Sequence, residues 1–307
     1  MVALQAQEGG VSSPILDARS LSKHFGAVAA ADNVSAAIDK DSVVGLIGTN
    51  GAGKTTFINM ITGYLKPDRG TIHYEGRDIT QLLPRDITRL GICRSFQIPQ
   101  LYSSLTVEEN MHMALGVVLW NARLGGFFSS GEPPVPGHGA PVREVAERLL
   151  ERFGLMPYRH RNAQVLPGGV RKLLDIALTM VAKPRVLLLD EPTSGVSAEE
   201  KFGIMQMVLE AVRAEGTTVL FVEHDMEVVA RFAQRVLAFY DGRVIADAPT
   251  AEALLRSRYS AYVTGNIDYV IEQNALLGLF PDRVMRDSGN AVFEVIVTRS
   301  WLKPTAG

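Results

Sequence analysis

The chain has 307 residues, 47% of them hydrophobic, which is enough for one large domain or two small ones around a full core. Its 31 basic and 33 acidic residues give a net charge of −2, which argues against nucleic-acid binding through bulk electrostatics. The single cysteine, Cys93, excludes an internal disulfide, and its apolar neighbours predict a buried side chain. No apolar run approaches the ~18–20 residues of a bilayer span, so we expect a cytoplasmic protein that reaches a membrane only through an integral partner.

The first part of the chain has the pattern of a strand-rich unit. Residues 1–13 are small and polar and predict a flexible leader. Alternating apolar positions over 15–38 indicate antiparallel strands, and the continuous apolar run 43–47 indicates a buried parallel strand. Helical spacing follows over 54–64, and after a Pro/Gly turn we expect another strand at 71–74.

The middle and last parts of the chain alternate helical and strand patterns. We expect a mainly helical region over about 84–183, interrupted by a Gly-, Pro- and Ser-rich loop at 121–141. Buried strands are predicted at 186–189 and 218–222, each associated with a helix, as in a parallel α/β sheet. Beyond residue 265, "NALLGLF" predicts a short amphipathic helix and "AVFEVIVT" a strand.

The stretch "GTNGAGKTT" begins directly after the predicted strand 43–47 and opens the predicted helix. Residues 48–55 match the phosphate-loop pattern G-x-x-x-x-G-K-[ST] in full. Glycines allow backbone N–H groups to turn around a phosphate, and the helix N-terminus adds the positive end of its dipole. Lys54 is expected to neutralise charge on the β- and γ-phosphates, and the Thr55 hydroxyl to bind Mg²⁺. The alternative, an ordinary glycine-rich turn, is weaker because the strand and helix lie where the motif requires them.

Two further strand ends carry polar residues suited to phosphate chemistry. The run "VLLLDE" ends in Asp190 and Glu191, which places two carboxylates at the ligand edge of a parallel sheet. Asp190 suits a Mg²⁺ shell, and Glu191 suits polarising an attacking water, although both could simply cap the next helix. His224 follows the strand 218–222; it could reach a γ-phosphate, but a purely structural histidine is equally compatible with the pattern.

These motifs, in this order, resemble those of the ATP-binding subunits of ABC transporters over residues 14–265. By that resemblance, 48–55 is the Walker A loop and 186–191 the Walker B strand, and His224 is the switch histidine. Gln97 in "RSFQ" corresponds to the Q-loop glutamine, which links the metal site to the permease contact. "LPGGVRK" stands in place of the family signature, and "TSGVS" in place of the D-loop.

The resemblance, together with the motif chemistry, assigns three sets of residues. Those expected to act in catalysis are Glu191, His224, Lys54 and Gln97, and those expected to bind Mg²⁺ are Thr55, Gln97 and Asp190. The residues expected to bind ATP include an aromatic side chain for adenine and the signature backbone: Phe25, Gly48, Thr49, Asn50, Gly51, Ala52, Gly53, Lys54, Thr55, Thr56, Leu166, Gly168 and Gly169.

The resemblance also implies an architecture and a branch of the family. It implies an α/β P-loop NTPase domain over 14–265 with an antiparallel β subdomain, a helical subdomain at about 84–183 and a C-terminal extension at 266–307. The sequences "RSFQ", "LTVEEN", "EHDMEVV" and "SAYVTG" are similar to those of branched-chain amino acid importers. We therefore expect an ATPase that works with permease subunits, a second ATP-binding subunit and, indirectly, a substrate-binding protein, on the cytoplasmic face of the membrane.

Three positions depart from the family pattern. The signature usually reads Leu-Ser-Gly-Gly-Gln, whereas Pro167 and Val170 replace the serine and the glutamine here, and Ser197 stands where the D-loop carries aspartate. Two hypotheses follow: pairing with a different subunit and one weakened hydrolysis site, or a signature that works mainly through backbone donors. Outside transport, the alternatives are a DNA-repair or translation ATPase, a subunit that binds ATP without hydrolysis, and a small-molecule kinase.

Overall fold

The computed structural model describes residues 13–95, 101–122 and 134–254, together with the backbone of strands β11 (Val284–Ser288) and β12 (Ala291–Val295). Within these residues, one sheet has the order β2-β1-β4-β5 and is antiparallel throughout. Its strands are β1 (Leu16–Phe25), β2 (Val28–Ile38), β4 (Arg69–Tyr74) and β5 (Arg77–Asp78). The antiparallel strands predicted for 15–38 and the strand predicted for 71–74 are confirmed.

A second sheet forms the centre of the described chain and has the order β10-β9-β3-β8-β7-β6. All its neighbouring pairs are parallel except β9 and β10. The three strands predicted from continuous apolar runs are confirmed in it. Its members are β3 (Val43–Ile47), β6 (Ile92–Ser95), β7 (Val186–Asp190), β8 (Thr218–Val222), β9 (Arg235–Tyr240) and β10 (Arg243–Pro249).

The central strands are apolar along their whole length because both faces of the sheet are covered. On β3, Val43 and Ile47 belong to one hydrophobic core, whereas Val44 and Leu46 belong to a second core with the antiparallel sheet. Period-2 alternation of side chains therefore sends successive residues into different cores. The Walker-type motifs at the ends of these strands are consequently held on a rigid platform.

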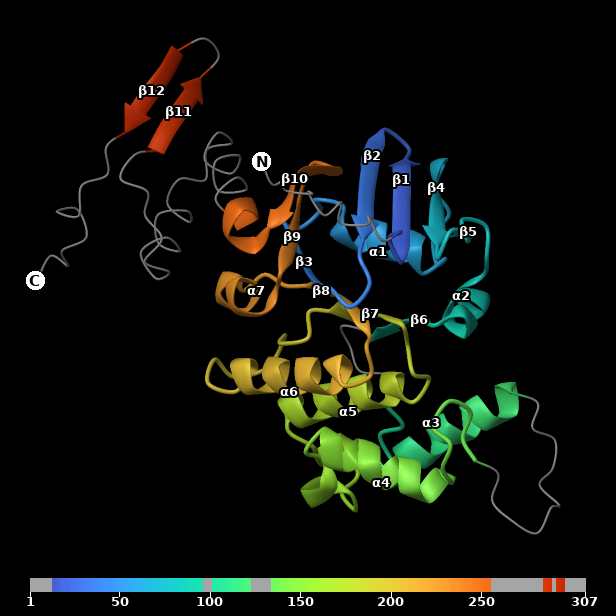
Figure 1. The fold of residues 1–307 in the computed structure, drawn as a ribbon. Helices are drawn as coiled ribbons and strands as arrows, with labels where there is room; N and C mark the ends of the chain where they lie inside the picture. Colours follow the sequence, from blue (N-terminus) through green and yellow to red (C-terminus); the bar gives the residue numbers. More distant parts are fainter. Residues whose placement is uncertain (1–12, 96–100, 123–133, 255–283, 289–290, 296–307) are drawn as a thin grey trace, which may run out of the picture.

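The helices divide between the two sides of the central sheet. Figure 1 shows α3, α4, α5 and α6 together on the side opposite the antiparallel sheet, while α1 lies beside that sheet. The helices are α1 (Lys54–Ile61), α2 (Pro84–Leu90), α3 (Val107–Asn121), α4 (Val142–Arg152), α5 (Gly168–Met180), α6 (Lys201–Arg213) and α7 (Met226–Phe232). None of the helices in the described part of the chain is long and apolar enough to cross a membrane.

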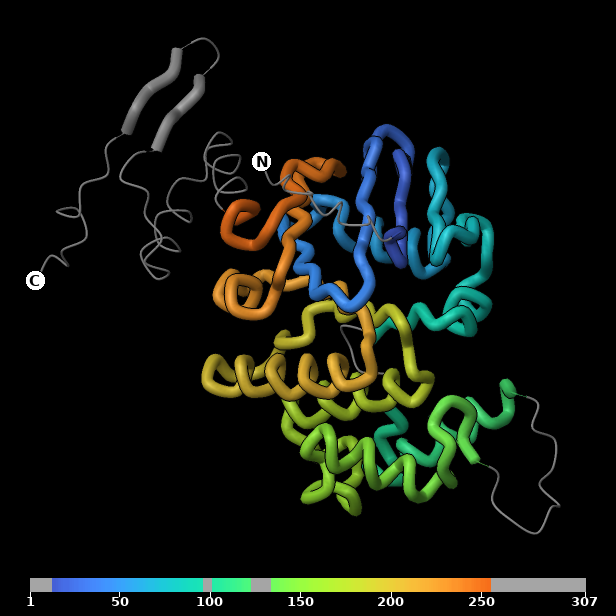
Figure 2. The backbone as a smooth tube through the Cα atoms, viewed as in Figure 1, coloured from blue at the N-terminus to red at the C-terminus, as the bar shows by residue number. Residues whose placement is uncertain are grey.

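Segments that are far apart in the sequence meet at one edge of the central sheet. Figure 2 shows the orange chain of β9 and β10 running beside the blue chain of β3. β9 pairs with β3, and the amide of Asp32 on β2 donates to the carbonyl of Gly242 at 2.8 Å. This contact fixes the antiparallel sheet next to the loop that follows β3.

The span 84–183, which the sequence assigns to a helical subdomain, contains a strand as well as helices. Strand β6 lies in that span and pairs in parallel with β7. The pattern "ICRS" is too short and too mixed to show a strand period, and only its pairing with β7 makes it one. The loop expected at 121–141 fits the end of α3 at Asn121 and the start of α4 at Val142. In the extension, β12 confirms the predicted strand, and the helix predicted for "NALLGLF" lies outside the described residues.

The single cysteine is buried, as its apolar neighbours predicted. Cys93, on β6, is 5% exposed, and burial raises the pKa of its thiol to about 11. At pH 8 we expect Ellman's reagent to react at least about 100-fold more slowly with the native protein than with guanidinium-unfolded protein, because only the thiolate attacks. Reaction at equal rates in the two states would show that the thiol is accessible.

Candidate nucleotide site

The loop between β3 and α1 wraps tightly because its glycines lie against backbone. Gly48 has φ +145°, and a Cβ on it would lie 2.3 Å from the carbonyl oxygen of Phe239. Gly53 has φ +103°, and a Cβ there would lie 2.7 Å from the carbonyl oxygen of Ala30 on β2. Side chains at these positions would clash, so both glycines are required by the packing of the loop as well as by its turn.

The Lys54 ammonium is held inside this loop. Its Nζ donates to the carbonyl oxygens of Gly48 at 2.6 Å and Thr49 at 2.9 Å, and the residue is only 6% exposed. Burial lowers the pKa of Lys54, while the nearby charges of Glu191 and Asp190 act in the opposite direction. The loop therefore presents a desolvated cation at the start of α1, an arrangement suited to phosphate.

Glu191 and His224, each expected at the end of a strand, meet at the carboxyl ends of neighbouring strands, a contact that the sequence analysis did not predict. His224 Nε2 lies 3.2 Å from Glu191 Oε1, and Glu191 follows β7 while His224 follows β8. Glu191 has φ +47°, a left-handed conformation that is unusual for a residue other than glycine, and its amide donates to the Val222 carbonyl at 3.1 Å. This strained turn directs an acid and an imidazole toward one another at the ligand edge of the sheet.

Asp190 is buried and has a partner that sequence reasoning missed. Arg94 on β6 donates from Nη2 to Asp190 Oδ2, and its Nη1 donates to Asn59 Oδ1 on α1 at 2.6 Å. Arg94 is the first residue of "RSFQ", a motif in which only the glutamine was assigned a role in the site. The pairing of β6 with β7, which was not predicted, brings the guanidinium to the carboxylate.

Two more buried polar groups support the end of β7. Lys172 Nζ on α5 donates to the Asp190 carbonyl at 3.1 Å, and burial lowers the pKa of this lysine. Glu223 Oε1 accepts from the Thr193 amide at 2.9 Å and from the Thr193 hydroxyl at 2.6 Å. Burial raises the pKa of Glu223, and these hydrogen bonds oppose the rise. The sequence, an apolar strand followed by "EH", did not predict these contacts between Glu223 and Thr193.

The residues in place of the family signature form the start of α5. Gly168 and Gly169 are its first two residues, Leu166 is 6% exposed, and Pro167 caps the helix without a side-chain hydrogen bond. The backbone N–H groups at this end therefore remain the available donors, as the sequence predicted. Val170 is partly buried against the helical core. An apolar side chain at this position thus has a packing role.

The segment in place of the D-loop lies next to the start of α5. A Cβ on Gly168 would lie 3.0 Å from the carbonyl oxygen of Gly195. Ser197 donates from Oγ to Glu200 Oε2 at 2.8 Å, just before α6. The Ser197 hydroxyl therefore binds the side chain of the residue that caps the start of α6.

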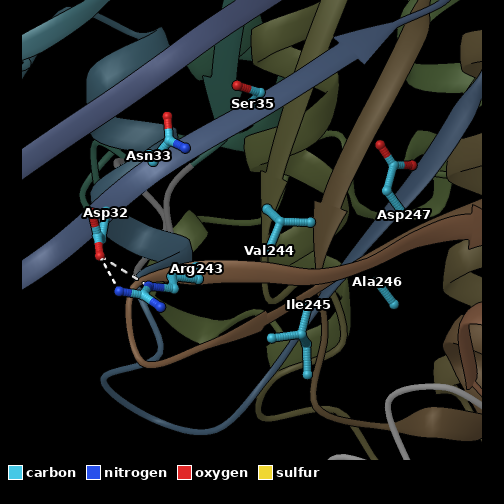
Figure 3. Close-up of a pocket in the computed structure, with 8 residues that line it drawn as sticks. All are labelled: Asp32, Asn33, Ser35, Arg243, Val244, Ile245, Ala246 and Asp247. Atoms are coloured by element: carbon cyan, nitrogen blue, oxygen red, sulfur yellow. Dashed lines mark hydrogen bonds and ion pairs between the residues drawn. The ribbon is translucent and has the colours of Figure 1, made fainter.

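Two further site residues were expected from the sequence, and the structure describes one of them. Phe25 ends β1 and is 54% exposed, an open aromatic side chain on the hairpin that leads into β2. Gln97 lies outside the described residues. A polar depression between β2 and β10 contains the Asp32–Arg243 ion pair but none of the expected site residues (Figure 3).

The described residues fit a bound metal ion only when a nucleotide supplies some of the oxygens around it. No group of three or more His, Cys, Asp or Glu side chains that could hold a metal occurs in the described ranges. Thr55 in the first turn of α1 and Asp190 at the end of β7 offer a hydroxyl and a carboxylate. Mg²⁺ commonly takes one or two protein oxygens and completes its shell with phosphate oxygens and water, so these residues fit Mg²⁺ bound with a nucleotide.

The motifs and their geometry agree with one protein family. The family model described as "ABC transporter" matches residues 31–194. The chain belongs to the ABC transporter family. It is the ATP-binding, ATP-hydrolysing cassette of a transporter, because its relatives and structural neighbours are ATP-binding subunits of that kind. A second, short match, to the middle NTF2-like domain of YchJ at residues 250–276, lies mostly outside the described residues.

Curated relatives of this ABC cassette extend over most of its length. It is 34% identical over 261 residues to the probable branched-chain amino acid transport ATP-binding protein LivG of Archaeoglobus fulgidus, covering 84% of this chain and 98% of the relative. It is 33% identical over 237 residues to the high-affinity LivG protein of Escherichia coli K12, covering 77% and 92%. A BraF protein of Pseudomonas aeruginosa, also a high-affinity branched-chain amino acid transport ATP-binding protein, matches equally well.

Solved structures show the same fold for this cassette. A nucleotide-free ATP-binding cassette from an ABC transporter superposes with a TM-score of 0.67 at 30% identity, covering 82% of this chain and 97% of that one. The structure of an ATP-binding cassette of an ABC transporter in its ADP conformation gives a TM-score of 0.66 at 30% identity, covering 84% of this chain and 97% of that one. The α/β cassette architecture expected from the motifs is therefore confirmed, and binding of adenine nucleotide follows from family membership.

Proposed function

We propose that this cassette hydrolyses MgATP to drive an importer of branched-chain or other hydrophobic amino acids, or of related carboxylates or amides. The observation that carries the hydrolysis is the Glu191–His224 pair beside the Lys54 loop. The names of the LivG and BraF relatives support the substrate class and the direction of transport. Permease subunits, a second ATP-binding subunit and a substrate-binding protein are the partners that this function requires.

The proposed roles follow from the position of each side chain. Glu191 orients and polarises the attacking water, and His224 holds both that carboxylate and the γ-phosphate in place. Lys54 neutralises charge that develops on the transferring phosphoryl group. Thr55, Asp190 and Gln97 would hold Mg²⁺, which neutralises phosphate charge when bound. Phe25 stacks on adenine, and the N–H groups of the signature glycines contact the nucleotide of the opposing subunit.

Pairing of two cassettes completes the site, because each signature serves the nucleotide of the opposing subunit. We expect purified Glu191→Gln protein with ATP to elute as a dimer if the start of α5 offers enough backbone donors. A monomer with bound ATP would instead identify a different subunit as the partner, one that supplies a standard signature. Size-exclusion chromatography with and without ATP, with bound nucleotide measured in the eluted peak, separates the two results.

Uptake by cells tests the transport function directly. A strain that lacks this chain should lose high-affinity uptake of radiolabelled leucine, and wild-type protein should restore it. The Lys54→Met variant should not restore it, because phosphate charge is no longer neutralised in the loop. Normal leucine uptake in the deletion strain would contradict branched-chain amino acids as the substrate. Retained uptake of a labelled amide and a labelled carboxylate in the same strain would contradict those related substrates as well.

A further inference from the structure

Arg94 forms a buried bridge between the two sides of the nucleotide site. Its Nη2 donates to Asp190 Oδ2 at the end of β7, and its Nη1 donates to Asn59 Oδ1 on α1, the helix that begins at Lys54. The side chains of Arg94 and Asp190 are each 10% exposed. The proposed mechanism uses Asp190 but leaves this ion pair without a role.

We propose that Arg94 is a positioning residue that acts as the internal counter-ion of Asp190 and sets how tightly the nucleotide site takes up its divalent cation. This inference rests on the proposed function, because it takes Asp190 as part of the cation shell. Arg94 itself touches neither nucleotide nor cation. It acts only through the carboxylate that it holds.

The electrostatics of burial give the direction of the effect. A buried carboxylate without a counter-ion is costly, so Arg94 stabilises the site before a cation arrives. A divalent cation next to the same carboxylate then meets the positive guanidinium, and the repulsion weakens its binding. The other charged groups near Asp190 are Glu191, its neighbour in the chain, and Lys54 and Lys172, whose pKa values the charge of Asp190 raises against the effect of burial. Removal of Arg94 should therefore raise the affinity of the site for the divalent cation.

The geometry of the bridge explains why an arginine is needed. A guanidinium presents several N–H donors in a fixed plane, so one side chain reaches Asn59 and Asp190 at the same time. Asn59 fixes one edge of the plane and leaves the other aimed at Asp190 Oδ2. Loss of the Asn59 carboxamide should loosen the ion pair without removing its charge.

Binding of a fluorescent ADP analogue to the full-length protein, titrated with Mg²⁺, tests the proposal without hydrolysis. In the Arg94→Met variant, the Mg²⁺ concentration that gives half of the Mg²⁺-dependent increase in ADP affinity should fall about tenfold. Asn59→Ala should lower it in the same direction by a smaller factor. The matched control is Arg152→Met, which breaks the partly buried ion pair between Arg152, at the end of α4, and Glu215, which follows α6. Neither residue belongs to the proposed site, so that concentration should stay unchanged.

The inference is overturned if folded Arg94→Met protein needs the same or more Mg²⁺ than wild type, since a merely structural arginine would alter stability alone. Should Arg94→Met not fold, the Asn59→Ala titration decides: a lower Mg²⁺ requirement supports the proposal and an unchanged one contradicts it. Wild-type protein that binds ADP with no dependence on Mg²⁺ would overturn the proposed Mg²⁺ site and the inference together. That result is distinguishable from a failure of Arg94 alone.

Discussion

Replacing Glu191 with glutamine is expected to reduce ATP turnover by about 100-fold or more, the usual range for loss of a general base. The amide keeps the size of the side chain and can still contact His224, which lies 3.2 Å from Oε1. It can no longer accept a proton from the attacking water. ATP affinity should remain within about a factor of two to three of wild type, because Lys54 and the loop glycines are unchanged.

Phosphate release and equilibrium ATP binding, measured on the same preparation, check this expectation. The matched control is Glu210→Gln on α6, where the exposed carboxylate accepts a hydrogen bond from Gln206 one turn earlier in the same helix. That variant should hydrolyse ATP at the wild-type rate. Wild-type turnover by the Glu191→Gln protein would show that another group activates the water.

Glu191 and His224 were each placed correctly at the end of a strand, because both strands could be recognised on their own, but their contact with one another was not predicted. The runs 186–189 and 218–222 are continuously apolar, as expected for parallel strands covered on both faces, and they pair directly as β7 and β8. Parallel neighbours bring their carboxyl ends to one edge. The local pattern was therefore sufficient for the two strand ends, whereas the pairing of β7 with β8 that joins them comes from the structure.

The contacts around Asp190 could not be predicted in the same way. Arg94 reaches Asp190 only because "ICRS" becomes strand β6, and Lys172 reaches the Asp190 carbonyl only because α5 packs near the end of β7. Both contacts join segments separated by many residues, and no local pattern records them. The burial of these charged side chains is likewise a property of the assembled core.

The departures from the family signature have a partial physical account in the structure. Pro167 is tolerated directly before α5 because the N-cap residue of a helix needs no intrahelical partner for an N–H group. Val170 packs against the core of the helical region. The sequence left two hypotheses open, a weakened signature or one that works through its backbone. Because α5 begins normally at Gly168, the segment folds as the second hypothesis, a signature that works through its backbone, requires. The dimerisation experiment tests whether that signature also binds ATP of the opposing subunit.

Replacing Lys54 with methionine is expected to weaken ATP binding by about 100-fold or more, since it removes a charge-assisted hydrogen bond to phosphate in a desolvated loop. The methionine keeps the aliphatic stem that packs in this buried position, so the fold should survive. Lys66→Met is the matched control: Lys66 also donates to a backbone carbonyl, that of Leu82, and burial likewise lowers its pKa. Isothermal titration with MgATP should show a large loss for Lys54→Met alone. Equal losses in both variants would mean that general destabilisation, rather than contact with phosphate, explains the effect.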